Sequence, residues 1–185
     1  MATETSNLSA LTGTWTIDPA HSTVEFVAKH MMVSKVRGLF RDFEGSFTVD
    51  EEVAKSGAEV TIQATSVDTG QPDRDNHLRS PDFFEVETYP ELRFKSTEVE
   101  LVSESKARIT GDLTIKDTTR PVTLDVVFND IIDSDAYGMT RAGFSVTASV
   151  NREEWNLTWN AAIEAGGVVV GKDVLLDLEI AATRS

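Results

Sequence analysis

Apolar and polar residues alternate along most of the chain, a pattern typical of β-strands with one buried face. The alternation is clearest where Ala58, Val60, Ile62 and Ala64 interleave with polar side chains. It returns at residues 107–116, 122–128, 142–150 and 174–182. Together with 13–17, 22–32, 36–49 and 91–102, these runs predict about nine strand segments, separated mostly by short turns.

Two of these segments change phase partway along their length. Val36, Gly38 and Phe40 share one parity, whereas Phe43, Phe47 and Val49 share the other. A second change lies at residues 96–98. Bends at 41–42 and 96–98 would produce both changes, as curved or closed sheets require. We therefore expect an all-β, antiparallel barrel of about eight strands, with short helices capping the lumen.

Two interruptions, at residues 70–88 and 152–167, are each long enough for a short helix and a loop. The second offers Asn151 as an N-cap, Glu153 and Glu154 for the first turn and Gly166-Gly167 as a stop. We expect the two interruptions to cap the barrel's ends. Residues 1–11 are expected to form a flexible N-terminal segment, and residues 12–185 a single barrel domain.

Small residues recur on the strand faces expected to point inward. They contribute little volume, so either a cavity remains between the larger side chains or the small residues match a tightly closed core. Both interpretations remain open for Ala28, Gly38, Gly45, Ala64, Ala107, Gly111, Ala142 and Ala148.

The net charge of -14 and the pI near 4.5 argue against nucleic-acid binding through a broad basic face. The chain has no cysteine, so it has neither a disulfide framework nor a thiolate nucleophile. No stretch is long and apolar enough to span a bilayer, and the first residues do not resemble a secretory signal. We expect a cytoplasmic protein.

The histidines are the natural candidates for chemistry. His30 shares its parity with Val24 and Phe26, so its imidazole is either hydrogen-bonded within an apolar face or turned toward a ligand. His77 lies between Arg74 and Arg79, where contact with a ligand head group competes with an internal ion pair. His21 suits a hydrogen bond within a turn. Because standard catalytic and metal-binding spacings are absent, we expect no catalytic residue, no metal site and no cofactor.

An ordered set of motifs resembles the YceI-like, polyisoprenoid-binding family from about Thr12 to Ala182. The amino-terminal half carries Trp15-Thr16-Ile17-Asp18-Pro19-Ala20-His21-Ser22, then Phe26, His30, Val36-Arg37-Gly38 and Phe43-Glu44-Gly45. The match continues with Arg74-Asp75 to Leu78, Phe83-Phe84, Tyr89-Pro90, Phe94, Gly111-Asp112-Leu113-Thr114-Ile115 and Asn151-Arg152. The chain departs from the family pattern at Asn156, where relatives commonly have glycine, which leaves the local turn an open question.

This resemblance implies a lipocalin-like barrel whose lumen holds a long isoprenoid or related amphipathic lipid. The residues that it assigns to the lipid tail are Phe26, Val36, Phe40, Phe43, Phe84, Phe94 and Trp155. The residues that it assigns to the head group, such as a pyrophosphate or a quinone, are His30, Arg74, His77 and Arg152. A homodimer with a shared opening would accommodate a tail too long for one barrel.

Our leading hypothesis is a carrier, store or scavenger of such a lipid that performs no chemistry on it. The first alternative is an enzyme that uses His30 or His77 as an acid or base on an apolar substrate. The second alternative is a structural barrel with a filled lumen.

Overall fold

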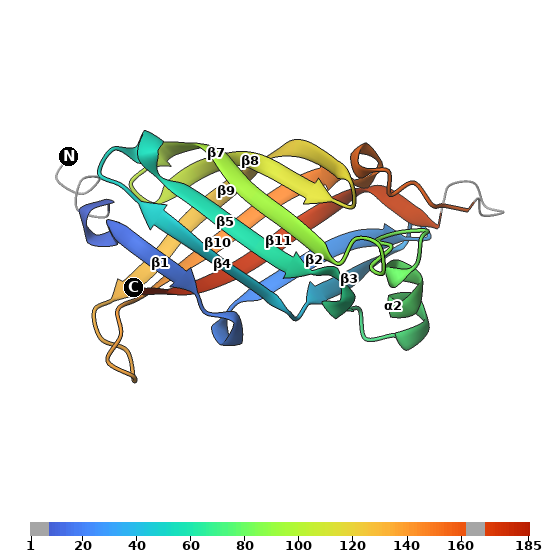
Figure 1. Cartoon of the computed structure of the whole chain (residues 1–185), viewed down its shortest axis with the longest axis horizontal. Helices are drawn as coiled ribbons and strands as arrows, with labels where there is room; N and C mark the ends of the chain where they lie inside the picture. The colour runs from blue at the N-terminus through green and yellow to red at the C-terminus, as the bar shows by residue number, and fades with distance from the viewer. Residues whose placement is uncertain (1–7, 162–168) are drawn as a thin grey trace.

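A computed structural model describes residues 8–161 and 169–185 as an antiparallel β-barrel with short helices near its ends (Figure 1). The α-helix is α2 (Pro72–Arg79), and residues 8–11 are also helical. The 3-10 helices are η1 (Pro19–His21), η2 (Val53–Lys55), η3 (Ala64–Ser66) and η4 (Arg152–Trp155). The strands are β1 (Gly13–Ile17), β2 (Thr23–His30), β3 (Ser34–Phe40), β4 (Phe43–Val49), β5 (Gly57–Gln63), β6 (Val67–Asp68), β7 (Glu91–Ser103), β8 (Lys106–Ile115), β9 (Thr118–Ile132), β10 (Arg141–Asn151) and β11 (Val170–Arg184).

Eight strands close the barrel in the order β1, β4, β5, β7, β8, β9, β10 and β11, because β11 also pairs with β1. The long strand β11 pairs with β2 over its first part and with β1 at its end. Strands β1 and β2 therefore act as one bent strand. Strands β3 and β4 form a second bent strand beside it, because β3 pairs with β2 and β4 pairs with β1. The predicted all-β antiparallel barrel is confirmed.

Both predicted bends are present. Strand β3 ends at Phe40 and β4 begins at Phe43, so the pairing is interrupted at residues 41–42. In β7, the register with β8 shifts between Ser96 and Glu98. Each change of parity in the sequence therefore corresponds to a real break in the strand, which keeps the apolar side chains on the inside.

Two of the inward glycines make room for aromatic rings. Gly38 pairs with Phe26 across β2 and β3, and a Cβ atom on Gly38 would lie only 2.2 Å from Phe26 Cζ. On β8, a Cβ atom on Gly111 would lie 2.5 Å from Phe94 Cζ. At these two positions the missing side chain is replaced by a neighbour's ring, so the tightly packed interpretation is the correct one.

The two interruptions meet at one end of the barrel, which corrects the expectation that they cap its two ends. Helix α2 and the residues after η4 both lie at the same end in Figure 1. Trp159 packs against His77 and Phe83, with ring centroids 4.6 and 5.6 Å apart. The helix predicted after Asn151 is the short η4, whose N-cap is Asn151, and the predicted Gly166-Gly167 stop lies outside the described residues.

The turn at Asn156 keeps a glycine-like conformation without glycine. Asn156 has φ 62° and ψ 24°, which is the left-handed region that asparagine tolerates better than most residues. Its backbone N–H donates to the carbonyls of Arg152 and Glu153, and its side-chain Nδ2 donates to Thr118 Oγ1 at 3.0 Å. The departure from the family pattern is therefore accommodated locally.

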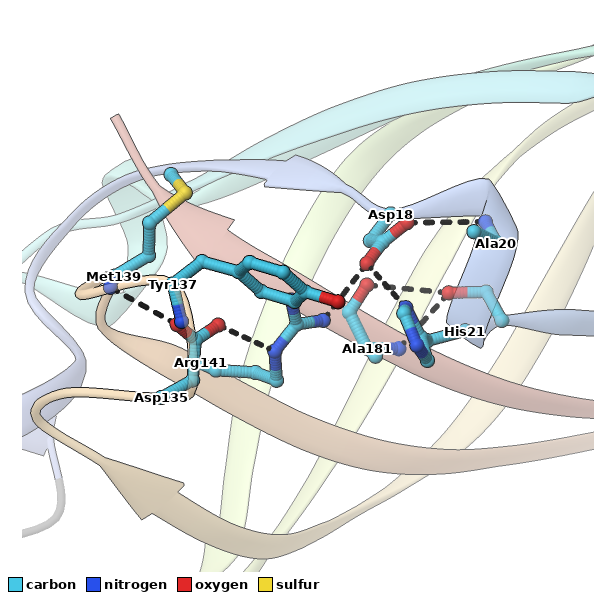
Figure 2. Close-up of polar contacts among 9 residues, drawn as sticks. Asp18, Ala20, His21, Asp135, Tyr137, Met139, Arg141 and Ala181 are labelled. Atoms are coloured by element: carbon cyan, nitrogen blue, oxygen red, sulfur yellow. Dashed lines mark hydrogen bonds and ion pairs between the residues drawn. The ribbon is translucent and has the colours of Figure 1, made fainter.

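Asp18 joins the β1–β2 bend to the β9–β10 hairpin (Figure 2). Its carboxylate accepts a 2.8 Å hydrogen bond from Arg141, which also donates to Asp135 at 2.9 Å. Asp18 further accepts from the backbone N–H of Ala20 and lies 2.7 Å from His21 Nδ1, as expected for a histidine within a turn. The Arg141 hydrogen bond is the main cause that lowers the pKa of Asp18 to about 2.

We predict that Gly38→Ala destabilises the barrel by about 1–3 kcal/mol, because the new methyl group overlaps the Phe26 ring. In a Phe26→Leu background the same substitution should cost at least about 1 kcal/mol less, since the ring is gone. Urea denaturation of the two single variants and the double variant measures this coupling. Strictly additive losses would contradict the packing described.

We also predict that Asp18→Asn lowers the free energy of unfolding at neutral pH by about 1 kcal/mol, allowing for solvent screening of a partly exposed pair. The folded-state pKa, about 2, lies below the ordinary value of 3.8, so the stabilisation is present above pH 3.8. It should disappear as the pH falls toward about 2. Urea denaturation of both proteins as the pH is lowered tests this, and a difference independent of pH would contradict it.

Candidate ligand-binding cavity

A cavity of about 200 Å³, partly open to solvent, lies in the half of the barrel away from α2. All eight closing strands contribute to its wall, together with the helical residues 8–11 and η2. The apolar lining residues are Leu8, Leu11, Ile17, Phe47, Val49, Val53, Ala58, Val60, Phe94, Val99, Leu101, Ala107, Ile109, Leu124, Val126, Phe128, Phe144, Val146, Leu178 and Ile180.

Aromatic rings hold this half of the barrel open. Phe144 of β10 contacts two neighbouring rings, in an edge-to-face pair with Phe47 at 5.5 Å between centroids and in a tilted pair with Phe128 at 5.8 Å. Phe47 in turn stacks on the fully buried Trp15 at 6.1 Å. Because the rings support one another, the wall keeps its shape without any side chain filling the centre.

Polar lining groups belong mainly to two turns at the cavity end. One is the β7–β8 turn, which contributes Ser103, Glu104, Ser105 and Lys106. The other is the turn between η2 and β5, which contributes Ser56. Glu104 and Lys106 are the only titratable residues in the described lining. The cavity can therefore surround an apolar group while offering hydroxyls and one charge of each sign at its end.

The opposite half of the barrel is filled. Phe83, Val86, Trp155 and Leu157 are buried there in one continuous apolar cluster with the inward residues of the strands. The lumen is thus packed at the α2 end and hollow at the other. Of the two interpretations of the small inward residues, the closed core applies to the first half and the cavity to the second.

Among the predicted tail-binding residues, Phe94 lines the cavity. Phe40 packs against both Phe26 and Phe84 in the filled half, with centroids 5.6 Å apart in each pair. Phe43 and Trp155 are buried in the same apolar cluster. Val36 is half-buried on β3, opposite Ala28 of β2, and is not part of the cavity wall.

The predicted head-group residues do not line the cavity either. In α2, Arg74 donates to the hydroxyl and the carbonyl of Thr69, at 2.7 and 3.0 Å. His77 Nε2 lies 2.9 Å from a carboxylate oxygen of Asp82. His30 is half-buried at the end of β2, where it pairs with Ser34 and Val170.

Arg152 acts as a clamp within the filled half. Its guanidinium donates to the carbonyls of Gly171 at 2.9 Å, Val170 at 3.2 Å and Leu157. The residue is only 5% exposed, and burial lowers the pKa of the guanidinium. These bonds tie the start of β11 to the segment after η4, so the donors are used within the protein.

The sequence interpretation did not identify Leu8 and Leu11, which belong to the segment expected to be flexible. In the structure residues 8–11 are helical, and Leu11 is only 8% exposed. Residues 1–7 lie outside the described residues. The three-residue spacing of the two leucines was the available signal, since it places both on one face of a helical turn.

The fold and the cavity together define a small closed β-barrel with an internal apolar compartment. The family model described as a YceI-like domain matches residues 15–182, and the chain belongs to this family. A UPF0312 protein of Staphylococcus epidermidis is 39% identical over 158 residues, covering 85% of this chain and 90% of the relative. A UPF0312 protein of Staphylococcus aureus is 41% identical over 161 residues, covering 86% and 91%.

Solved structures share the fold. Burkholderia cenocepacia BcnA superposes with a TM-score of 0.78 at 25% identity, covering 90% of this chain and 99% of BcnA. A Campylobacter jejuni YCEI protein gives 0.72 at 29% identity, covering 85% and 90%. A polyisoprenoid binding domain from Saccharophagus degradans gives 0.67 at 16% identity, covering 92% and 98%, a likeness of fold alone.

None of the helices formed by the described residues has the length and apolar character needed to cross a membrane. The same residues contain no group of three histidine or carboxylate side chains placed to hold a metal ion.

We predict that Arg152→Met and Arg152→Lys each lower the free energy of unfolding by about 2–4 kcal/mol. Lysine keeps the charge but lacks the planar fork that reaches several carbonyls, so it should not restore stability. Urea denaturation measures the loss. If both variants unfold at the same urea concentration as the parent, Arg152 is not the clamp described here.

Proposed function

We propose that the protein binds the apolar tail of an amphipathic lipid, of the isoprenoid class, in the cavity between residues 8–11 and the middle of the barrel. It would act as a carrier, store or scavenger that performs no chemistry on the lipid. The observation that carries the proposal is the cavity itself, whose wall is apolar on all eight closing strands.

Transfer of the tail out of water supplies the affinity. Each methylene group buried against such a wall contributes about 0.8 kcal/mol, and no hydrogen bond is needed along the tail. The name of the Saccharophagus degradans domain, a polyisoprenoid binding domain, supports the choice of ligand class, although that protein shares only the fold. Among the predicted tail contacts, Phe94 has the position that the proposal requires.

The head group in this proposal lies at the cavity end, near the β7–β8 turn. The predicted head-group cations, Arg74 and Arg152, are engaged by Thr69 and by backbone carbonyls at the other end of the barrel. Lys106 is the cation in the described lining, and Glu104 accompanies it. Hydroxyls in that turn favour an uncharged head, such as an alcohol or a quinone, over a pyrophosphate.

The position of the cavity does not support the enzyme hypothesis, in which His30 or His77 acts as the acid or base. Neither His30 nor His77 lines the cavity, so neither imidazole faces a substrate bound there. A general acid or base must come within hydrogen-bonding reach of the reacting atom. Binding without chemistry is the simpler function for this wall.

We predict that Ala107→Phe abolishes ligand binding, because a ring at this lining position of β8 occupies the cavity. The matched control is Ala136→Phe, which adds the same ring to the exposed β9–β10 hairpin. Organic extraction and mass spectrometry of the purified proteins should find a stoichiometric amphipathic lipid in the parent and the control, and none in Ala107→Phe.

Displacement of a fluorescent fatty acid provides a second measure in lipid-free protein, and circular dichroism checks that the variants remain folded. The parent and Ala136→Phe should bind the fatty acid at least about tenfold more tightly than Ala107→Phe. Equal binding by all three proteins, or by none, would overturn the proposal.

A further inference from the structure

The helical residues 8–11 line the cavity but are held differently from the strands. Leu8 and Leu11 both line it, and Leu11 is buried. The other elements of the wall are held by the hydrogen-bond ladders of the barrel or by the turns between neighbouring strands. Residues 8–11 precede β1 and belong to no ladder, so they can move without breaking the sheet.

Few bonds attach this turn to the barrel. Trp15 Nε1 donates to the carbonyl of Leu11 at 2.7 Å, and Arg184 Nη2 donates to the carbonyl of Ala10. The third side-chain bond, from Thr12 Oγ1 to the carbonyl of Leu8 at 2.9 Å, is local to the turn. Within the described part of the chain, two side-chain hydrogen bonds, one from β1 and one from β11, therefore attach the turn to the barrel, and Leu11 packs with Trp15, Ala142 and Ala182 in a small apolar cluster.

Arg184, one of these two side chains, has a buried donor without an acceptor in residues 8–161 or 169–185 while the turn is in place. The Arg184 guanidinium carbon lies 4.7 Å from the centre of the Trp15 ring, and Arg184 Nε is buried without a hydrogen-bond partner among the described residues. A buried donor without an acceptor disfavours the state that buries it. Displacing the turn would release the Arg184 guanidinium from the Ala10 carbonyl, so that its Nε could reorient toward water and offset part of the lost contacts.

The cavity is too small for a long prenyl tail while residues 8–11 are in place. A volume of about 200 Å³ is below the range of about 300–1,000 Å³ that is usual for pockets of drug-sized ligands. A long prenyl tail exceeds such a space. The filled half of the barrel cannot supply more room without moving the buried Trp155 and Phe83.

We propose that residues 8–11 form a displaceable plug, in which Leu8 and Leu11 occupy the place of the outer part of a long tail. Short tails bind beneath the plug, and longer tails push it aside, so these two leucines set the tail length that the protein accepts. This inference rests on the proposed function and adds the residues that determine its specificity.

The test compares geraniol, farnesol and geranylgeraniol, three prenyl alcohols of increasing length, with the full-length protein. In Leu8→Ala/Leu11→Ala, binding of geranylgeraniol should strengthen roughly tenfold relative to the parent, whereas binding of geraniol should change little. The matched control is Ser9→Ala/Ala10→Ser, which alters exposed side chains of the same turn and should leave all three affinities unchanged.

Hydrogen exchange of the parent protein gives a readout that needs no variant. Amides of residues 8–12 should exchange faster when geranylgeraniol is bound and should be unaffected by geraniol. If all three alcohols bind but the variant keeps the parent's length preference and exchange does not change, the plug is refuted while the proposed function stands. If no alcohol binds to any of the proteins, both proposals fail.

Discussion

The pairing of β11 with both β1 and β2 is the constraint on which the rest of the structure depends, because it closes the sheet into a barrel. Once the sheet is closed, every inward side chain shares one interior, which must be filled from within or left hollow. At one end the segments around α2 and η4 supply buried rings that fill it, Phe83 and Trp155 among them. At the other end strand side chains, residues 8–11, η2 and two turns line the lumen without filling it, and a cavity remains.

This division separates polar from apolar recognition. At the filled end, Arg152 joins the segment after η4 to the start of β11, and Arg74 donates to Thr69 in the loop before α2. At the hollow end, the lining offers contact area and few hydrogen-bonding groups. A ligand held there is selected by the shape and length of its apolar part, because dispersion and desolvation act over the whole surface and do not distinguish individual atoms. That is the kind of recognition expected for a prenyl or other hydrocarbon tail.

Strand parity in the sequence predicted most of the barrel. Breaks of parity at residues 41–42 and 96–98 located real bends, because a bulge or break is the only way to return apolar side chains to the inside. Parity also placed Phe128 and Phe144 inward, yet it could not tell which half of the lumen is hollow, since it is the same along the whole barrel. The position of the hollow half depends on both interruptions folding over the same end of the barrel. There Trp159 of one interruption contacts Phe83 of the other, and this contact is tertiary. The three carbonyl partners of Arg152 come from residues that no local pattern connects to it, so the sequence could not predict these bonds.

The central claim is that an apolar ligand occupies the half of the barrel away from α2. Methyl-detected NMR during titration with farnesol tests it most directly, because isoleucine, leucine and valine methyl groups lie in both halves. The account predicts that the signals of Ile109 and Leu124, which line the cavity, shift on binding, while those of Val67 and Val86 in the filled half stay in place. Shifts confined to Val67 and Val86 would place the ligand at the α2 end and contradict the account.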